Sequence, residues 1–214
     1  IAVGMDLGWI DKNPFFGFKC PYKETTQVIL TQQELASIEE KTFDIPRLEL
    51  VKNLFLFQCY TGLSYVDMAN LTHANMVKGN DNNDWLVLSR TKSKIPVRIP
   101  LLSIARRIVF LYNEDLTGTL KPLLPMYANQ KMNSYLKEIA DVCNVAKNLS
   151  SHVGRRTFAT TVCLSNGVPI ETVSKLLGHT NLRTTQVYAK VVDTKISMEM
   201  NQLEKILGKR EGQG

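Results

Sequence analysis

The chain has 214 residues, of which 44% are hydrophobic and 21% are charged, a composition that is ordinary for a globular protein with one sizeable core. It contains no apolar run of the roughly eighteen residues that a membrane span requires, so no span is predicted. Its 26 Lys and Arg residues outnumber 20 Asp and Glu residues, and the resulting net charge of +6 permits nucleic-acid binding without requiring it.

Residues 1–27 are predicted to form a tail and connector, because glycines and prolines would interrupt any long element there. The chain begins at Ile1 without a signal-peptide pattern, and we expect it to be a piece of a longer protein. Regular structure is predicted to start at Thr31, because Thr31-Gln32-Gln33-Glu34 is a capping box in which two side chains satisfy free backbone amides at a helix start.

A strongly apolar helix is predicted from Arg47 to Tyr60, opened by Pro46 and closed by Gly62. Because it is apolar over most of its circumference, we expect it to lie at the centre of the core. A β-hairpin follows within residues 84–100, where two β-rich runs flank the basic tip Arg90-Thr91-Lys92-Ser93-Lys94.

The remainder of the chain is predicted to be helical, with Gly167 and Gly178 at helix C-caps. The expected helices lie near residues 101–112, 130–143, 151–166, 169–177, 181–190 and 194–207. The fold class is therefore mainly α with a small antiparallel β-sheet. The four cysteines lack zinc or disulfide spacing and indicate buried thiols in a reducing cytosol, and the scattered acidic residues indicate no metal site.

Three polar clusters interrupt this pattern. His152 and Arg155 project from the same face of a predicted helix near its start, where backbone amides add to the attraction of a phosphate. His179 follows a glycine C-cap, and Tyr188 lies on an amphipathic helix. Lys92 stands on the hairpin tip. Taken separately, each cluster is more often a solvated, capping or packing feature than a functional one.

Taken together, the clusters resemble the tyrosine recombinase (phage-type integrase) family. The resemblance rests on the order Lys92, His152-x-x-Arg155, Gly178-His179 and Tyr188, and on Thr61-Gly62-Leu63 followed by Asp67, which resembles the first conserved box of that family. The resemblance runs from about residue 28 to 200. Because all the motifs occur in the expected order, it outweighs the structural interpretation of each cluster taken alone. It implies the catalytic-domain fold of that family, with residues 1–27 as the end of an N-terminal core-binding domain and residues 28–214 as the catalytic domain.

The resemblance also implies a mechanism without metal, ATP or other cofactor. Tyr188 would attack a DNA phosphodiester and form a 3′-phosphotyrosyl bond. Arg155 would hold the phosphate, His179 would donate to the same oxygens, His152 would assist proton transfer at Tyr188, and Lys92 would protonate the departing 5′ oxygen. Further contacts with double-stranded DNA are expected from Arg156, Lys94 and Arg183.

The sequence departs from the family at Ser64, where the first box usually has an arginine that holds the phosphate. A hydroxyl cannot supply a cation or a two-pronged donor, so either the protein is an inactive DNA binder or another basic residue substitutes. The other motif residues are present, which favours substitution, and some integrases of bacterial conjugative and mobilizable transposons show a similar replacement. Lys52 and Arg47 are the candidates, although a solvated stripe formed by Glu49, Lys52 and Asn53 is the more ordinary interpretation.

The expected function is therefore site-specific DNA recombination in the bacterial cytoplasm, for integration or excision of a mobile element. The alternatives are a type IB-like topoisomerase and a noncatalytic DNA-binding module. No membrane and no small-molecule substrate is expected. The amphipathic helix over residues 194–207 could pack on its own domain or could join a neighbouring protomer in a homotetramer on DNA, and its apolar stripe fits both arrangements.

Overall fold

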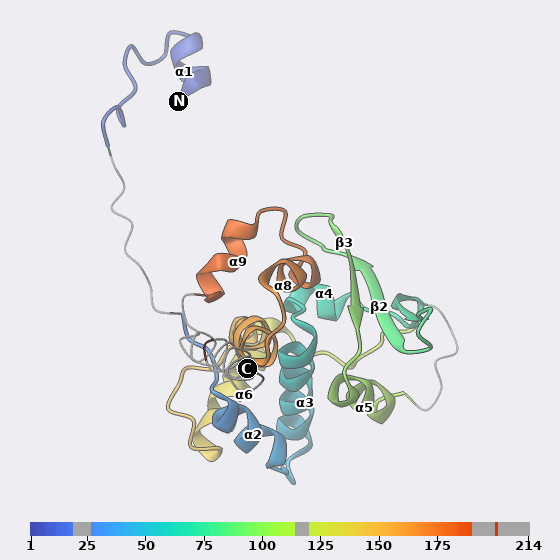
Figure 1. The fold of residues 1–214 in the computed structure, drawn as a ribbon. Coiled ribbons are helices and arrows are strands. Elements are labelled where there is room, and N and C mark those ends of the chain that lie inside the picture. Colours follow the sequence, from blue (N-terminus) through green and yellow to red (C-terminus); the bar gives the residue numbers. More distant parts are fainter. Residues whose placement is uncertain (19–26, 114–119, 190–199, 201–214) are drawn as a thin grey trace, which may run out of the picture.

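The computed structural model describes residues 1–18, 27–113, 120–189 and 200 (Figure 1). The predicted helix over residues 194–207 lies outside the described residues, apart from Met200. The short helix α1 (Ala2–Asp6) buries none of its residues. No helix within the described ranges is long and apolar enough to cross a membrane.

Helix α2 (Gln32–Glu40) begins at the predicted capping box, which is confirmed. The Glu34 amide donates to Thr31 Oγ1 at 3.2 Å, and the Thr31 amide donates to Glu34 Oε2 at 2.7 Å. These two bonds satisfy backbone donors that the first turn of a helix leaves free. The helix packs against α3 through Leu35 and Ile38, which are buried.

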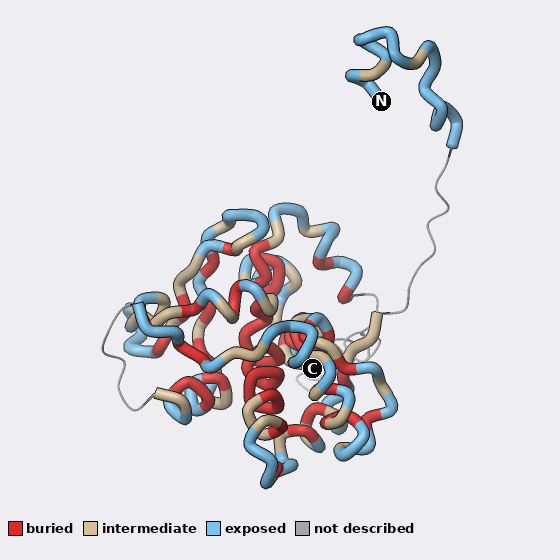
Figure 2. Tube along the Cα trace, turned by 180° about the vertical axis from the view of Figure 1, so that it is seen from behind, coloured by how far each residue is buried: buried red, intermediate tan, exposed pale blue. Residues whose placement is uncertain are grey.

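Helix α3 (Pro46–Thr61) is the central core helix that the sequence predicted. It is buried around its circumference from Val51 onward, and α5, α6 and α7 pack around it (Figures 1 and 2). It ends at Gly62, which has a left-handed φ of 66°. A Cβ atom there would lie 2.4 Å from the ring of Phe158, so this turn requires glycine for space as well as for conformation.

The predicted hairpin is confirmed and belongs to a three-stranded antiparallel sheet in the order β1-β2-β3. Leu86 pairs with Ile99 and Leu88 pairs with Val97 across β2 and β3. The first strand was not predicted, nor was helix α4, which leads from the Gly62 turn towards the sheet. The bounds are α4 (Tyr65–Ala69), β1 (Met76–Lys78), β2 (Asp84–Ser89) and β3 (Pro96–Pro100), with a 3-10 turn η1 (His73–Asn75) before β1.

The remaining helices follow the predicted order, and the mainly α fold with a small antiparallel sheet is confirmed. They are α5 (Ser103–Leu111), α6 (Asn129–Val142), α7 (Ser151–Thr157), α8 (Ile170–Leu177) and α9 (Leu182–Ala189).

The single helix predicted over residues 151–166 is wrong in detail, because α7 continues as a π-helix, η2 (Phe158–Cys163), and a 3-10 turn, η3 (Leu164–Asn166). Thr160 Oγ1 donates to the Arg156 carbonyl at 2.8 Å, so a side chain competes with the backbone for this helix acceptor. The Leu30 amide donates to Thr157 Oγ1 at 3.1 Å, and Thr161 Oγ1 donates to the Leu30 carbonyl. A widened turn accommodates these bonds to another segment, as π-helical turns often do near functional sites.

Candidate active site

Helix α7 brings Arg155 to the place where two other helices end. Arg155 Nη1 donates to the carbonyl of Gly62 after α3, and its Nη2 donates to the carbonyl of Leu177 at the end of α8, at 2.8 Å. Both acceptors lie at helix C-termini, where the backbone carries partial negative charge that favours a cation. The guanidinium is therefore anchored by segments far apart in the sequence.

His179 lies beside this guanidinium because α8 ends at Gly178, whose left-handed φ of 67° turns the chain. Arg155 Nη2 lies 3.3 Å from His179 Nε2, and His179 Nδ1 lies 2.9 Å from Thr185 Oγ1. A guanidinium only donates hydrogen bonds, so Nε2 is the acceptor in the neutral ring and Nδ1 donates to Thr185.

Tyr188 is held on α9 against the same imidazole. The rings of His179 and Tyr188 are stacked, with centroids 6.4 Å apart and planes 20° apart. Thr185 and Tyr188 are three residues apart and therefore share one face of α9, so that one helix face fixes the histidine through both the hydroxyl and the phenol ring. The Tyr188 side chain is 8% exposed.

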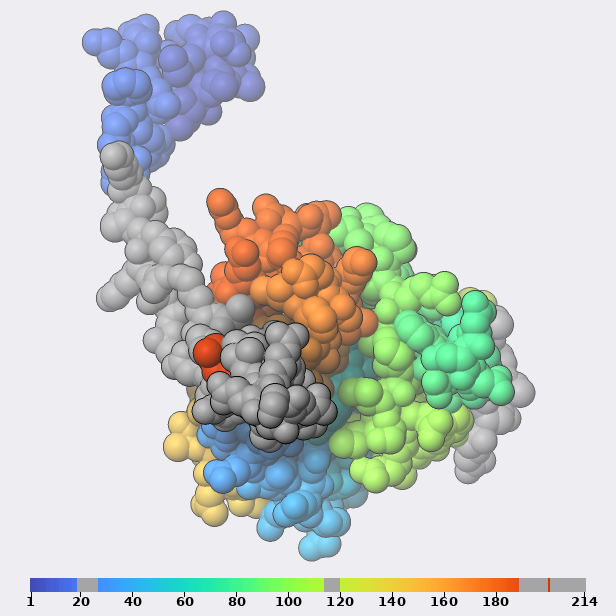
Figure 3. Space-filling view, viewed as in Figure 1, coloured from blue at the N-terminus to red at the C-terminus, as the bar shows by residue number. Residues whose placement is uncertain are grey.

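One cleft of about 800 Å³ collects the predicted catalytic residues. Helix α8 packs against β3 of the hairpin beside it, and α9 packs against α8, as the orange and green surfaces of Figure 3 show. The structure thus brings together five residues that the sequence singled out from four separate segments. They are Lys92, His152, Arg155, His179 and Tyr188, and Ser64 lines the same cleft.

Arg90 also lines the cleft, and the sequence analysis did not single it out as a site residue. Its side chain is 4% exposed, and it donates to Asp67 Oδ2 at 3.1 Å and to the Leu176 carbonyl at 2.7 Å. Asp67 also accepts from Ser64 Oγ at 2.7 Å. A signal was present in the sequence, because Arg90 continues the even-numbered series of inward positions along β2 after Leu86. A charge at an inward strand position needs a partner or a function.

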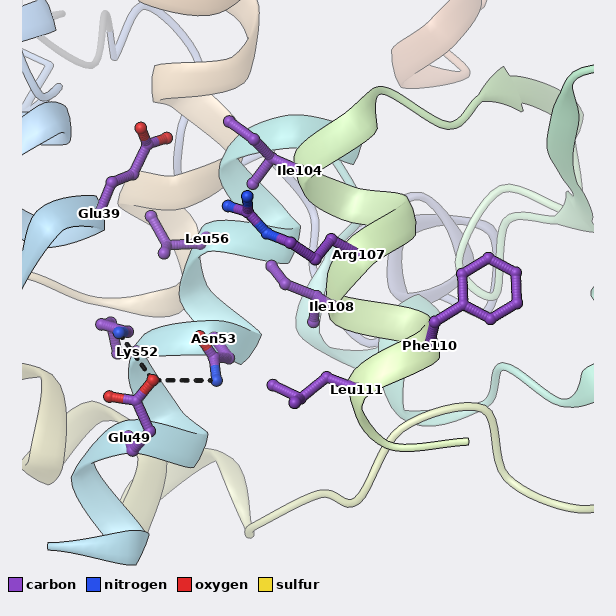
Figure 4. Close-up of a pocket in the computed structure, with 10 residues that line it drawn as sticks. All are labelled: Glu39, Glu49, Lys52, Asn53, Leu56, Ile104, Arg107, Ile108, Phe110 and Leu111. Carbon is purple, nitrogen blue, oxygen red and sulfur yellow. Dashed lines mark hydrogen bonds and ion pairs between the residues drawn. The ribbon is translucent and has the colours of Figure 1, made fainter. Parts of the chain in front are cut away.

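The two residues proposed as replacements for the missing arginine do not line the cleft. Lys52 lies in the first half of α3, ten residues before Gly62, which corresponds to about 15 Å along the helix axis. Its Nζ contacts Glu49 Oε1 at 2.7 Å and the Lys41 carbonyl at 2.8 Å, beside a separate hollow (Figure 4). Arg47 is paired with Glu138 at 3.1 Å and lies over the Tyr135 ring. Both cations have local structural partners.

The other expected DNA contacts lie outside the cleft lining. Lys94 on the hairpin tip and Arg183 on α9 are exposed, whereas Arg156 is half-buried. Their contact with DNA stays a prediction. Among the described residues, no group of three or more His, Cys, Asp or Glu side chains could hold a metal ion.

The electrostatics of the cleft favour an anionic ligand. Burial, together with the nearby charge of Arg90, lowers the pKa of Arg155 to about 10. Burial, Arg155 and Arg90 together lower the pKa of His179 to about 4. Burial, Arg156 and Arg155 also lower the pKa of His152. Cations that repel one another around one cleft are relieved by an incoming phosphate, and such perturbed groups are typical of functional sites.

The depressed pKa of His179 predicts a loss of stability in mild acid. The folded protein keeps this imidazole neutral down to about pH 4, whereas the unfolded chain binds the proton near pH 6.5. The stabilising contribution is therefore present above pH 6.5 and is lost as the pH falls towards 4. Denaturant unfolding across this range should show a shallower pH dependence in His179→Gln than in the parent. Identical slopes would contradict the prediction.

Gly178 should tolerate no side chain. A Cβ atom there would lie 2.9 Å from both Arg90 Cγ and Val97 Cγ1, in a backbone with φ of +67°. Gly178→Ala is expected to lower the free energy of unfolding by about 1–3 kcal/mol. Gly167→Ala is the matched control, because Gly167 has φ of +80° but nothing within 4 Å of its added Cβ. Equal losses in the two variants, measured by urea unfolding, would show that the packing against Arg90 is unimportant.

Known proteins match this arrangement in sequence and in fold. The model of the "Phage integrase family" matches residues 29–195. A tyrosine recombinase XerC from Rickettsia bellii is 33% identical over 147 residues, covering 65% of this chain and 46% of the relative. A XerC from Bacillus licheniformis is 26% identical over 198 residues, covering 85% of this chain and 63% of the relative. The chain therefore spans less than two thirds of the length of these relatives.

Solved structures show the same fold at low sequence identity. A crystal structure of XerA recombinase superposes with a TM-score of 0.65 at 19% identity, covering 83% of this chain and 66% of that one. The Tn1549 transposon integrase in complex with a circular intermediate DNA gives a TM-score of 0.66 at 15% identity, covering 87% and 70%. A lambda integrase dimer bound to a core site gives 0.66 at 15% identity, covering 87% and 68%. The predicted catalytic-domain fold is thereby confirmed.

Proposed function

This chain belongs to the phage integrase family, and we propose that it is the catalytic part of a site-specific DNA recombinase that uses Tyr188 as its nucleophile. One observation carries the proposal. Arg155, His179 and Tyr188 meet in one cleft, bonded or stacked to one another, although they come from helix α7, the turn after α8 and helix α9. The neighbouring Tn1549 and lambda integrases were solved with DNA, which supports DNA as the substrate here.

The reaction exchanges one phosphoester for another without redox chemistry. The Tyr188 phenol oxygen attacks phosphorus, a bond from that oxygen to phosphorus forms, and the bond from phosphorus to the 5′ oxygen breaks. The phenol proton passes to His152, and the departing 5′ oxygen takes a proton from Lys92. A 5′ hydroxyl of a partner strand then reverses the steps. The energy of the phosphoester is conserved, so no ATP is required, and we propose that the cations of the cleft take the place of a metal.

In the transition state, negative charge develops on the nonbridging oxygens of the phosphate, and the buried cations stabilise it. Arg155 is held in place by two carbonyl oxygens, and its remaining N–H groups are available to a phosphate oxygen. Because these donors are fixed before the phosphate arrives, they stabilise the transition state without reorganisation. His179 lies beside Arg155 and supplies a donor once a phosphate raises its pKa.

We assign the role of the missing first arginine to Arg90. Arg90 and Ser64 line the same cleft and share Asp67 as a partner. The Arg90 guanidinium therefore lies near position 64, where the family usually has an arginine and this chain has a serine. Arg90 also lies close to Gly178, the residue that directly precedes His179. Lys52 and Arg47, which the sequence suggested, have their charges satisfied elsewhere.

A suicide DNA substrate tests the proposal. A duplex drawn from the DNA that flanks the gene, nicked so that religation is blocked, should trap a covalent protein–DNA adduct on a denaturing gel. Tight binding without an adduct would favour the noncatalytic DNA-binding alternative. Relaxation of supercoiled DNA without strand exchange would favour the topoisomerase. The domain boundary near residue 27, the homotetramer on DNA and the cytoplasmic location stay predictions.

A further inference from the structure

Gln58 is a polar residue in the most apolar part of the protein. It lies in the last turns of α3, its neighbours Phe57 and Cys59 are buried, and its own side chain is 0% exposed. A primary amide is costly to bury unless its donors and acceptor are hydrogen-bonded. The partners of Gln58 therefore indicate what the amide is kept for.

Those partners belong to two segments of the candidate active site, the start of α7 and the turn at Gly62. Gln58 Nε2 donates to Ser151 Oγ at 2.8 Å and to the Leu63 carbonyl at 3.2 Å, and Ser151 Oγ donates to Gln58 Oε1 at 3.0 Å. Ser151 is the first residue of α7 and directly precedes His152. Leu63 directly follows Gly62, whose carbonyl accepts from Arg155.

Packing between the two helices reinforces the bonds. A Cβ atom on Gly154 would lie 3.1 Å from Gln58 Cβ, so α7 lies directly against α3 at this point. Ser151 and Gly154 are three residues apart and form the face of α7 that touches Gln58. His152 and Arg155, also three residues apart, form the adjacent face. The Ser151 and Gly154 face of α7 is thus fixed on α3, while the adjacent face presents His152 and Arg155 to the cleft.

We propose that Gln58 is a positioning residue of this active site, whose buried amide fixes the start of α7 and the Gly62 turn relative to each other. The contacts form a closed circuit that runs from Gln58 to Ser151, along α7 to Arg155, across to Gly62 and back through Leu63. Because proximity effects are steep, a displacement of about 1 Å in His152 or Arg155 can cost about 100-fold in rate. The inference rests on the proposed recombinase function for its catalytic consequence.

The substitution Gln58→Met keeps the length of the side chain and removes the amide. At saturating protein, the rate of adduct formation on the nicked duplex is expected to fall about 100-fold, while the Kd for the same DNA stays within about twofold, since the amide touches no exposed surface. Asn53→Leu is the matched control. Asn53 is another buried amide of α3, bonded to Tyr112 Oη at 2.9 Å, and it lies away from the cleft. Its substitution should leave the rate unchanged.

Ser151→Ala provides a milder variant, since it removes only the partner hydroxyl. It should slow adduct formation in the same direction as Gln58→Met, and the double variant should be no slower than Gln58→Met alone, because both remove one shared interaction. Independent additive losses would overturn the proposal, as would a parental rate in Gln58→Met.

Histidine NMR separates this inference from the recombinase proposal. The chain has 3 histidines, so the imidazole signals of His152, His179 and His73 are readily assigned. Gln58→Met should move the His152 signal and leave that of His73 in place, and Asn53→Leu should leave the His152 signal in place. If the parent forms no adduct, the recombinase proposal fails, yet the His152 signal still decides whether Gln58 positions α7. An unmoved signal would refute that role.

Discussion

Replacement of Tyr188 by phenylalanine is expected to abolish the covalent protein–DNA adduct. The phenol oxygen is the atom that would bond to phosphorus, and no other atom of the side chain can replace it. Phenylalanine preserves the ring that stacks on His179 with its centroid 6.4 Å away. The free energy of unfolding should therefore change by no more than about 0.5 kcal/mol, and DNA affinity should be retained.

The measurement is a time course of adduct formation on the nicked duplex, resolved on a denaturing gel. Tyr60→Phe is a matched control, because Tyr60 is 9% exposed and its hydroxyl bonds to Glu39 outside the cleft. It should form the adduct at the parental rate. An adduct that persists in Tyr188→Phe would mean that another residue is the nucleophile, and a tyrosine-specific mechanism would have to be abandoned.

The features that the sequence predicted well are those that local chemistry decides. The capping box at Thr31, the proline at the start of α3 and the glycine after α8 each act within one turn of a helix, so their residue types suffice. Strand β1 has 3 residues and no alternation to read. The stretch that contains the π-helix after α7 is bonded through two threonine hydroxyls to Leu30, more than a hundred residues away in the chain, and no local pattern indicates such a contact.

In the active site, too, the sequence indicates the order of the residues but not how distant segments pack. The order of His152, Arg155, His179 and Tyr188 is a property of the sequence, and the cleft confirms that these side chains meet. Lys52 stood out in the sequence as a charge among the apolar residues of helix α3, but it lines a separate hollow and not the cleft. Arg90 lies opposite α8 only because the hairpin packs there in three dimensions. The alternation along β2 indicates that Arg90 points inward, but no local pattern shows which elements it meets there.

Substitution of Arg90 by methionine is expected to slow adduct formation by about 100- to 1,000-fold, the usual loss when one preorganised donor is removed from a transition state. The folded protein should also lose about 3–5 kcal/mol of stability, because Asp67 would be left buried without its cation. Rates must therefore be compared at a temperature where both proteins remain folded, as judged by circular dichroism.

Lys52→Met is the matched control for this loss of stability. Like Arg90, Lys52 is a buried cation, with a side chain 7% exposed, that contacts one carboxylate and one backbone carbonyl. Lys52→Met should also destabilise the fold, though by less than Arg90→Met because Glu49 is 31% exposed and Asp67 only 5%, and only Arg90→Met should slow cleavage. A comparable loss of rate in Lys52→Met would mean that general destabilisation, or a role for Lys52 itself, explains the effect.

A rescue experiment with Ser64→Arg tests the role of Arg90 directly, because Ser64 lines the same cleft as Arg90. If Arg90 supplies the cation that the first box lacks, an arginine restored at position 64 in the Arg90→Met background should recover a substantial part of the lost rate. The recovery should appear in the cleavage rate more than in DNA affinity, since the second cation acts on charge that develops in the transition state. Recovery of stability without recovery of rate would instead make Arg90 a structural partner of Asp67.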